Sequence, residues 1–313
     1  MSVALPGLVT GLVFGALLTR GGICFNRGVR RAFLDRDAAI LRVFGLVVAV
    51  ELLALPLLVA IGVAPLERNV DAGAPALLPV AQLTGGLVFG VGMALAGGCI
   101  TGILWKAGAG SVATGIAIAG FALGELLATG AAAEVLRELD DASRPSESSL
   151  SQLSGLSYEL VAPIVGVAAL ALLLRRRRDG LWLGVALGVV ASLAWVAAEI
   201  ADYGYGLGFV GAAEGTRDAI ETGGELPFQL FLAIGVVVGG ALVARRPPRS
   251  PSAARAAGAL LGGALMGVGA NAAHGCNIGH GVTGLGLLSV GSLVAIAAMA
   301  VGAMVTARIV RRE

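Results

Sequence analysis

The chain alternates long apolar stretches with polar connections, several of which are rich in arginine. A helix needs about 20 apolar residues to cross the hydrocarbon core of a bilayer. Since irregular backbone cannot face lipid, such stretches predict membrane-spanning helices, and we expect an all-α integral membrane protein. The pattern predicts about nine spans, some of them short for a complete crossing, at residues 5–21, 43–63, 82–97, 111–133, 159–174, 181–200, 227–244, 258–273 and 289–307.

The composition supports this class of protein and excludes others. Of 313 residues, 57% are hydrophobic and only 13% are charged, whereas soluble domains carry roughly 25% charged residues. The alternating pattern of a β-barrel strand is absent. The 49 glycines allow membrane helices to pack closely and to be interrupted. No basic block is dense or aromatic enough to predict binding of nucleic acid, so the lipid bilayer is the expected surrounding.

The placement of arginine predicts the orientation, because cytoplasmic connections carry an excess of Lys and Arg. The connections at 64–81, 134–158 and 201–226 are long and poor in both residues, which places the N-terminus outside and the C-terminus in the cytoplasm. The N-terminus has no basic stretch before its first apolar run, so we do not expect a cleaved signal peptide. The arginines that fall on the cytoplasmic side are Arg27, Arg30, Arg31, Arg36, Arg42, those at 175–178, Arg245, Arg246, Arg249, Arg255, Arg308, Arg311 and Arg312.

One motif occurs three times along the chain. It consists of a Gly-x-x-x-Gly pentapeptide in an apolar helix, a Gly-rich break and a cysteine, which in each copy is the thirteenth residue after the first glycine. The three cysteines of these copies are the only ones in the chain, and an odd number does not predict a disulfide framework. The copies are Gly11–Gly15 with Cys24, Gly86–Gly90 with Cys99, and Gly263–Gly267 with Cys276.

A fourth copy has the pentapeptide without the cysteine: Gly184–Gly188 is followed, at the same spacing, by Ala197. The four copies divide the chain into halves of four helices, at residues 1–135 and 180–313, joined by a central helix at about 159–174. An odd helix between two like halves gives them opposite orientations, as in the inverted repeats of transporters. We therefore expect one membrane transport domain over 1–313. The connection at 134–158 is expected to be the least ordered part of the chain.

The Gly-rich breaks predict a site for an anion. An interruption frees backbone groups that lipid cannot satisfy, so they must face a protein-lined cavity. Gly22, Gly98 and Gly275 allow close approach to the backbone, and a helix that starts after the break directs its N–H groups at that point. Substrate sites of inverted-repeat transporters lie where such discontinuous helices meet.

The cysteines in these breaks suit a sulfur-containing anion. A thiol is a soft and weak donor, which matches a polarisable atom such as sulfur or selenium. A neutral S–H group can donate to an anion, whereas a thiolate would repel it. Weak sites in series also favour conduction, because each must release what it binds. The alternative is that each cysteine is a small buried hydrophobic residue, the usual role of free cysteine.

Polar residues beside the cysteines are the other candidates for contact with the anion. Both histidines of the chain lie near Cys276, but their spacing fits no zinc pattern, and no metal site is predicted. Glu51, Glu125 and Glu199 fall within predicted spans, where each could carry a coupling proton, occupy a helix end or make a structural hydrogen bond. The candidates for lining the path are Asn26, Thr101, Lys106, Asn271, His274, Asn277 and His280.

Each cysteine lies in a longer motif, at Gly22–Gly28, Ala96–Ser111 and His274–Gly284. These motifs resemble those of the YeeE/YedE sulfur-transport family, and the resemblance covers essentially the whole chain. The resemblance implies an inner-membrane protein that takes up thiosulfate through a pore lined by Cys24, Cys99 and Cys276. It also implies a possible partner, a small TusA-like sulfur carrier protein in the cytoplasm, and some relatives handle selenium. Ala273-His274 departs from the smaller residues of the family, and His274 adds bulk and a titratable group at this position.

The leading hypothesis is therefore a transporter, not an enzyme, that passes a sulfur-containing anion between neutral thiols and needs no cofactor. A second hypothesis is a membrane sulfur-transfer protein whose cysteines form persulfides. The sequence shows no nucleophile–base pair typical of cysteine enzymes, which counts against it. A membrane scaffold for a cytoplasmic sulfurtransferase is a third hypothesis, and transport of a selenium or another sulfur species is a variant of the first.

Overall fold

The computed structural model describes residues 3–62, 76–143, 149–175, 179–244, 247 and 250–310. Every secondary-structure element that these residues form is a helix. The all-α prediction is therefore confirmed. The elements are α1 (Ala4–Gly21), α2 (Phe25–Leu34), α3 (Ala39–Ala60), α5 (Pro79–Ala96), α6 (Ile100–Gly108), α7 (Val112–Thr129), α8 (Ala133–Ser143), α9 (Leu150–Ser154), α10 (Tyr158–Leu174), α11 (Leu181–Ile200), α12 (Ala212–Thr222), α13 (Phe228–Val243), α14 (Ala253–Ala272), the π-helix η2 (Gly279–Gly284) and α15 (Val290–Val310).

The long apolar helices coincide with the predicted spans. Seven stretches are long and apolar enough to cross a bilayer, two of them formed by α1 with α2 and by α5 with α6, and α10 and α13 are shorter apolar helices. The ends differ from the prediction by a few residues, in one case because a polar side chain caps the helix outside its apolar run. The Ser252 side chain, for example, accepts the Arg255 N–H and starts α14 before its apolar stretch.

Close contacts at glycines establish the relative directions of the long helices. Helix α1 runs parallel to α13, α3 parallel to α11, and α5 parallel to α15 but antiparallel to α14. Within each of these pairs, the directions agree with helices that cross a membrane one after another along the chain. The contacts that set them are Gly7 with Phe231 and Gly15 with Val236, Gly184 with Leu46 and Gly188 with Val50, Gly86 with Ala295 and Gly90 with Met299, and Gly85 with Gly269 and Gly92 with Gly262.

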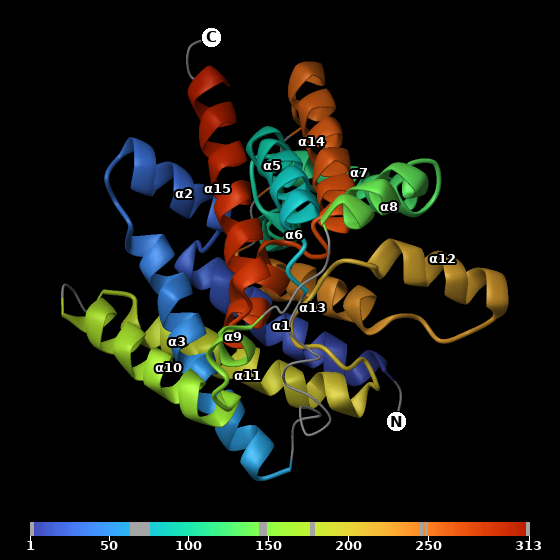
Figure 1. The fold of residues 1–313 in the computed structure, drawn as a ribbon. Helices are drawn as coiled ribbons and strands as arrows, with labels where there is room; N and C mark the ends of the chain where they lie inside the picture. Colours follow the sequence, from blue (N-terminus) through green and yellow to red (C-terminus); the bar gives the residue numbers. More distant parts are fainter. Residues whose placement is uncertain are drawn as a thin grey trace.

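The long helices form two groups that meet in the middle of the molecule (Figure 1). Helices α5, α7, α14 and α15 stand together in one group, and α1, α3, α10, α11 and α13 form the other. The short helices that follow the breaks join the groups, since α6 packs against α13 and α2 packs against α15. The breaks therefore lie where the two groups meet.

The connection at 134–158, expected to be the least ordered part, has residues 144–148 outside the described residues, and the rest of it includes two short helices. It contains α8 and α9, and α9 begins with a capping box in which Ser149 and Gln152 satisfy each other's backbone N–H groups. The Leu150 N–H also donates to the Leu288 carbonyl (3.0 Å), so this connection is tied to the core. The predicted arginines at 176–178, 245, 246, 249, 311 and 312 lie outside the described residues.

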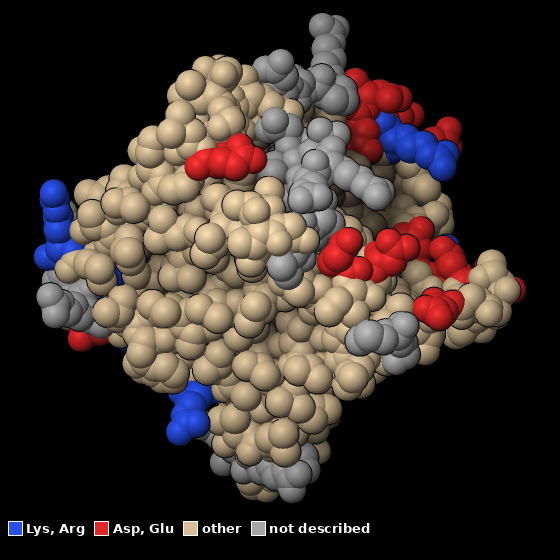
Figure 2. All heavy atoms as spheres, turned by 90° about the horizontal axis from the view of Figure 1, so that it is seen from below, with Lys and Arg blue, Asp and Glu red and all other residues tan. Residues whose placement is uncertain are grey.

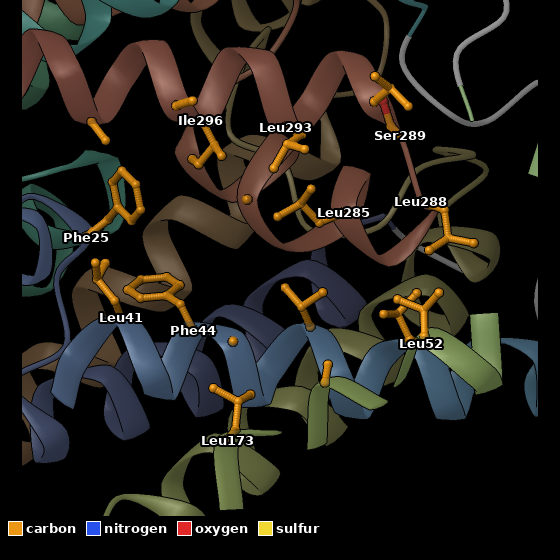
Figure 3. Close-up of a pocket in the computed structure, with 18 of the residues that line it drawn as sticks. Phe25, Leu41, Phe44, Leu52, Leu173, Leu285, Leu288, Ser289, Leu293 and Ile296 are labelled. Atoms are coloured by element: carbon orange, nitrogen blue, oxygen red, sulfur yellow. The ribbon is translucent and has the colours of Figure 1, made fainter. Parts of the chain in front are cut away.

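An apolar groove of about 780 Å³ lies between α3, α10 and α15 (Figure 3). Phe25 and Phe44 meet edge to face in its wall, with ring centroids 5.7 Å apart. An anion would lose its hydration in this groove without gaining a strong donor, so the groove is not the candidate anion site. The outer surface is also mostly apolar. Figure 2 shows a face largely free of charged side chains, with Asp and Glu gathered on one side.

Candidate functional site

The first two breaks have the same backbone construction. Helix α1 ends at Gly21, Gly22 takes a left-handed conformation (φ 59°), and the extended Cys24 is the N-cap of α2. In the same way, Gly97 (φ 79°) ends α5 and Cys99 is the N-cap of α6. Glycine adopts a positive φ without the steric cost of a Cβ atom. The structure thus has the predicted interruptions, with a new helix starting at each cysteine.

The fold brings Cys24 and Cys99 together. Their Sγ atoms are 3.7 Å apart, and both side chains are fully buried. The Phe25 N–H of α2 donates to Cys99 Sγ (3.3 Å), and Thr101 Oγ1 of α6 lies 3.5 Å from the same sulfur. Two thiols, a hydroxyl and the first turns of two helices therefore converge on one point, where the helix dipoles favour negative charge.

The interrupted backbone is held by side chains from across the site. Trp105 Nε1 donates to the Ile23 carbonyl (2.9 Å), and Lys106 Nζ donates to the Gly97 carbonyl (2.8 Å). Asn26 Nδ2 donates to the Met93 carbonyl (2.9 Å). The Ile23 and Gly97 carbonyls in the breaks thus obtain side-chain donors, as the apolar surroundings require, and Asn26 adds a donor to the Met93 carbonyl at the end of α5.

Cys276 occupies a third break, between α14 and η2. Its buried Sγ accepts the Gly279 N–H at 3.4 Å, and no other thiol lies within hydrogen-bonding distance of it in the described structure. All three cysteines belong to one continuous buried cluster. The sequence predicted three equivalent positions, whereas the structure has a close pair and a separate third cysteine.

Three of the polar residues predicted around Cys276 have protein partners. His280 is buried between the Ala273 carbonyl (2.8 Å from Nε2) and Ser292 Oγ (3.0 Å from Nδ1). Its ring fills the space beside Gly275, where a Cβ atom would lie 2.7 Å from Nε2. The other two are Asn271, which donates to the Gly267 carbonyl (3.0 Å), and the largely exposed His274, whose Nε2 pairs with Asp140 Oδ1 (2.7 Å).

Asn277 differs from these residues. Its side chain is fully buried, and both its amide nitrogen and its amide oxygen lack a hydrogen-bond partner within the described structure. Asn26 Oδ1 in the first break is buried and unpartnered too. Since buried polar groups are nearly always paired, these atoms mark positions beside Cys276 and Cys24 where a polar ligand could bind.

A polar cavity of about 800 Å³ opens beside the first two breaks. Gly22, Trp105 and three cationic side chains line it: Arg27, Lys106 and Arg255. Arg255 reaches across from α14 and donates to the carbonyls of Leu95 and Ala96 (2.8 and 3.0 Å). The sequence reasoning treated Arg255 only as a charge that orients the chain, because nothing in the sequence shows that α14 begins beside the end of α5.

The three glutamates predicted within spans have different surroundings. Glu51 Oε1 accepts the Trp195 Nε1–H (2.9 Å), and its other oxygen is buried without a partner among the described residues. Glu125 accepts two backbone N–H groups, from Gly211 and Ala213. Glu199 is exposed in the last turn of α11, which is the helix-end position that the sequence left open as an alternative.

Comparison with known proteins places these features in context. The model of a family described as sulphur transport matches residues 20–182 and 171–305. The thiosulfate transporter TsuA of Spirochaeta thermophila is 30% identical over 92% of this chain and 93% of its own. The thiosulfate transporter TsuA of Escherichia coli is 25% identical over 90% of this chain and 87% of its own. A probable transporter, YedE of Salmonella typhimurium, is 34% identical over 34% of this chain and 24% of its own.

Proposed function

The chain belongs to the sulphur transport family, and from this premise we propose that it takes up thiosulfate across the cytoplasmic membrane. Two relatives that align over most of their length are named thiosulfate transporters, and the apolar helices are those of a multi-pass membrane protein. The geometry of the breaks supports this choice of cargo and the path that we propose for it.

The observation that carries the proposal is the meeting of Cys24 and Cys99 at the starts of α2 and α6. Their buried thiols lie 3.7 Å apart, next to the Thr101 hydroxyl. Neutral S–H groups and helix N-termini together attract a divalent anion without holding it by a fixed charge. Soft sulfur donors also match the terminal sulfur of thiosulfate better than the oxygens of sulfate.

We place Cys276 and Asn277 at the outer end of the same path. The unpartnered Asn277 amide can donate to an oxyanion and lies next to the third thiol. Helix α14 is antiparallel to α5, so the break after α14 faces the opposite side of the membrane from the break after α5. With the N-terminus outside, the anion meets Cys276 first and then the Cys24–Cys99 pair.

The packing supports two halves of opposite orientation. Helix α1 packs against α13, and the corresponding pair, α11 and α3, also packs together. Helix α5 packs against α15, and α14 packs against α7 in the same way. Exchanging the halves thus reproduces the contacts, as expected if they are inverted repeats around a central site.

The cavity lined by Arg27, Lys106 and Arg255 is the proposed exit to the cytoplasm. It adjoins both breaks and carries three cationic groups, which draw the anion away from the thiols by long-range attraction. A TusA-like sulfur carrier would receive the anion at this opening.

Uptake of radiolabelled thiosulfate into proteoliposomes tests the proposed function. We expect uptake above that of empty liposomes, with unlabelled thiosulfate competing strongly and sulfate weakly, because only thiosulfate offers a soft sulfur atom. Selenite serves as a second competitor. Folded protein that produces no uptake, or that transports sulfate equally well, would refute the assignment.

Replacing Lys106 with methionine should slow thiosulfate uptake by about three- to tenfold, because the exit cavity loses one of its charges. The difference between the variant and the unmodified protein should shrink as salt is raised, since salt screens the attraction between the Lys106 charge and the anion. The matched control is Arg308→Met, which removes an exposed cation in the last turn of α15. Equal losses in both variants, or no dependence on salt, would contradict a role for Lys106 in steering the anion.

A further inference from the structure

We propose that Glu125 is a positioning residue that holds the outer cysteine, Cys276, in place for the anion. Glu125 belongs to α7 and does not contact Cys276, so it acts through the segment that follows α11. The proposal rests on the proposed function, in which Cys276 meets the anion.

Glu125 anchors the start of α12. One carboxylate oxygen accepts the Gly211 N–H (2.6 Å) and the other accepts the Ala213 N–H (3.0 Å). These are the N-cap and the second residue of an 11-residue helix, whose free N–H groups and dipole favour a negative group. The carboxylate makes no ion pair with the described residues, so these two N–H groups are its main partners.

The start of α12 resembles a fourth break. Here the Glu125 carboxylate, which comes from α7, accepts the first N–H groups of the helix, and no cysteine lies at its start. The three other breaks each carry a cysteine at or near the start of the helix that follows. Here the chain leaves α11 after Ile200 and enters α12 at Ala212. Ala197, at the cysteine spacing of the fourth copy, lies inside α11, so the sequence repeat alone does not locate this break.

The segment between α11 and α12 covers the break that contains Cys276. Thr283 Oγ1 donates to the Leu207 carbonyl (2.7 Å), and the Tyr205 hydroxyl donates to the Gly279 carbonyl (2.9 Å). Phe209 is buried in the same apolar cluster as Cys276, and Phe209 is only two residues from Gly211. The segment is thus fixed to η2 along its length and to Glu125 at its end.

Glutamate is suited to this position because it can satisfy both N–H groups at once. Glutamine offers one acceptor oxygen and a donor NH₂ group, so it would lose one of the two hydrogen bonds and the charge at the helix start. Aspartate keeps the charge but is one methylene shorter. We expect Glu125→Gln to release the segment over Cys276, and Glu125→Asp to release it partly.

The test compares cysteine reactivity in the full-length protein in membranes. N-ethylmaleimide is applied to a variant in which Cys276 is the only cysteine and to another in which Cys99 is the only cysteine. Glu125→Gln should raise the labelling rate of Cys276 by at least about tenfold, the effect of losing one hydrogen bond to a charged group, and leave the labelling rate of Cys99 within about twofold. The labelling rate of Cys276 in Glu125→Asp should lie between the rates in the unmodified chain and in Glu125→Gln. The control is Glu134→Gln, which changes an exposed carboxylate on α8.

Thiosulfate uptake gives a second readout in the protein with all three cysteines. Glu125→Gln should raise the KM for thiosulfate more than it lowers the maximal rate, because the outer site is disturbed before the inner pair. An unchanged rate of Cys276 labelling, or equal rises at Cys276 and Cys99, would overturn the proposal. If the unmodified protein does not transport thiosulfate, the proposed function fails, but the labelling still decides whether Glu125 positions Cys276.

Discussion

Replacing Cys99 with alanine is expected to abolish thiosulfate uptake while leaving the protein folded in the membrane. Cys99 Sγ is the sulfur that Cys24, the Phe25 N–H and Thr101 all approach. Alanine removes the thiol at the centre of this group and leaves a buried gap between two helix starts, so the anion coming from the outer site loses its central donor. We expect uptake to fall by at least about 100-fold, comparable to the loss of a well-placed donor in a buried site.

The measurement is radiolabelled uptake in proteoliposomes with equal amounts of reconstituted protein. Cys99→Ser is the matched variant, since it keeps a small donor and should retain part of the activity. Uptake by Cys99→Ala near the unmodified rate would remove Cys99 from the path. A stable adduct of about 32 Da on Cys99 after exposure to thiosulfate would instead indicate persulfide transfer.

The second large effect is expected from Gly102→Ala. A Cβ atom at Gly102 would lie 2.5 Å from Cys24 Sγ and 3.4 Å from Cys99 Sγ. Since the first distance is far below van der Waals contact, the added methyl group must push Cys24 away from its partner. A displacement of about 1 Å at a built site can cost about 100-fold in rate, and we expect a loss of that order in uptake.

Gly115→Ala is the control for this substitution. Gly115 lies inside α7, and an added Cβ atom would meet nothing within 4 Å. Alanine is favoured over glycine inside a helix by about 1 kcal/mol, so this variant should be at least as stable as the original and fully active. Both variants are compared by uptake and by thermal unfolding in detergent. If Gly102→Ala transports normally, the close approach of α6 to Cys24 is not needed for function.

Much of the helical framework could be predicted from the sequence, because the bilayer imposes a length and a composition on each span. The interruptions could be predicted too. Gly22 and Gly97 adopt the left-handed conformation that glycine allows, and α2 and α6 begin at the next cysteine. The helix ends were less accurate, and the start of α14 shows one reason, since its cap depends on the single side chain of Ser252 outside the apolar run.

The partners of the polar candidates could not be predicted. His274 lies two residues before Cys276 and His280 four residues after it, yet His274 pairs with Asp140 of α8 whereas His280 is buried against Ser292 of α15. Asn277 is the one of these neighbours left without a partner in the described structure. These partners belong to other helices, α8 for His274 and α15 for His280. The residues next to each histidine in the sequence therefore do not predict its partner.

By itself, the sequence determined that this protein is a helical membrane protein with three cysteines in Gly-rich interruptions. These properties follow from hydropathy, from the conformational freedom of glycine and from spacing along one chain. Only the tertiary structure decided that Cys24 and Cys99 form a pair while Cys276 stands apart, and that Glu125 holds the start of α12. Contacts between distant segments depend on which helix faces pack together, and small residues throughout this chain would permit several such packings.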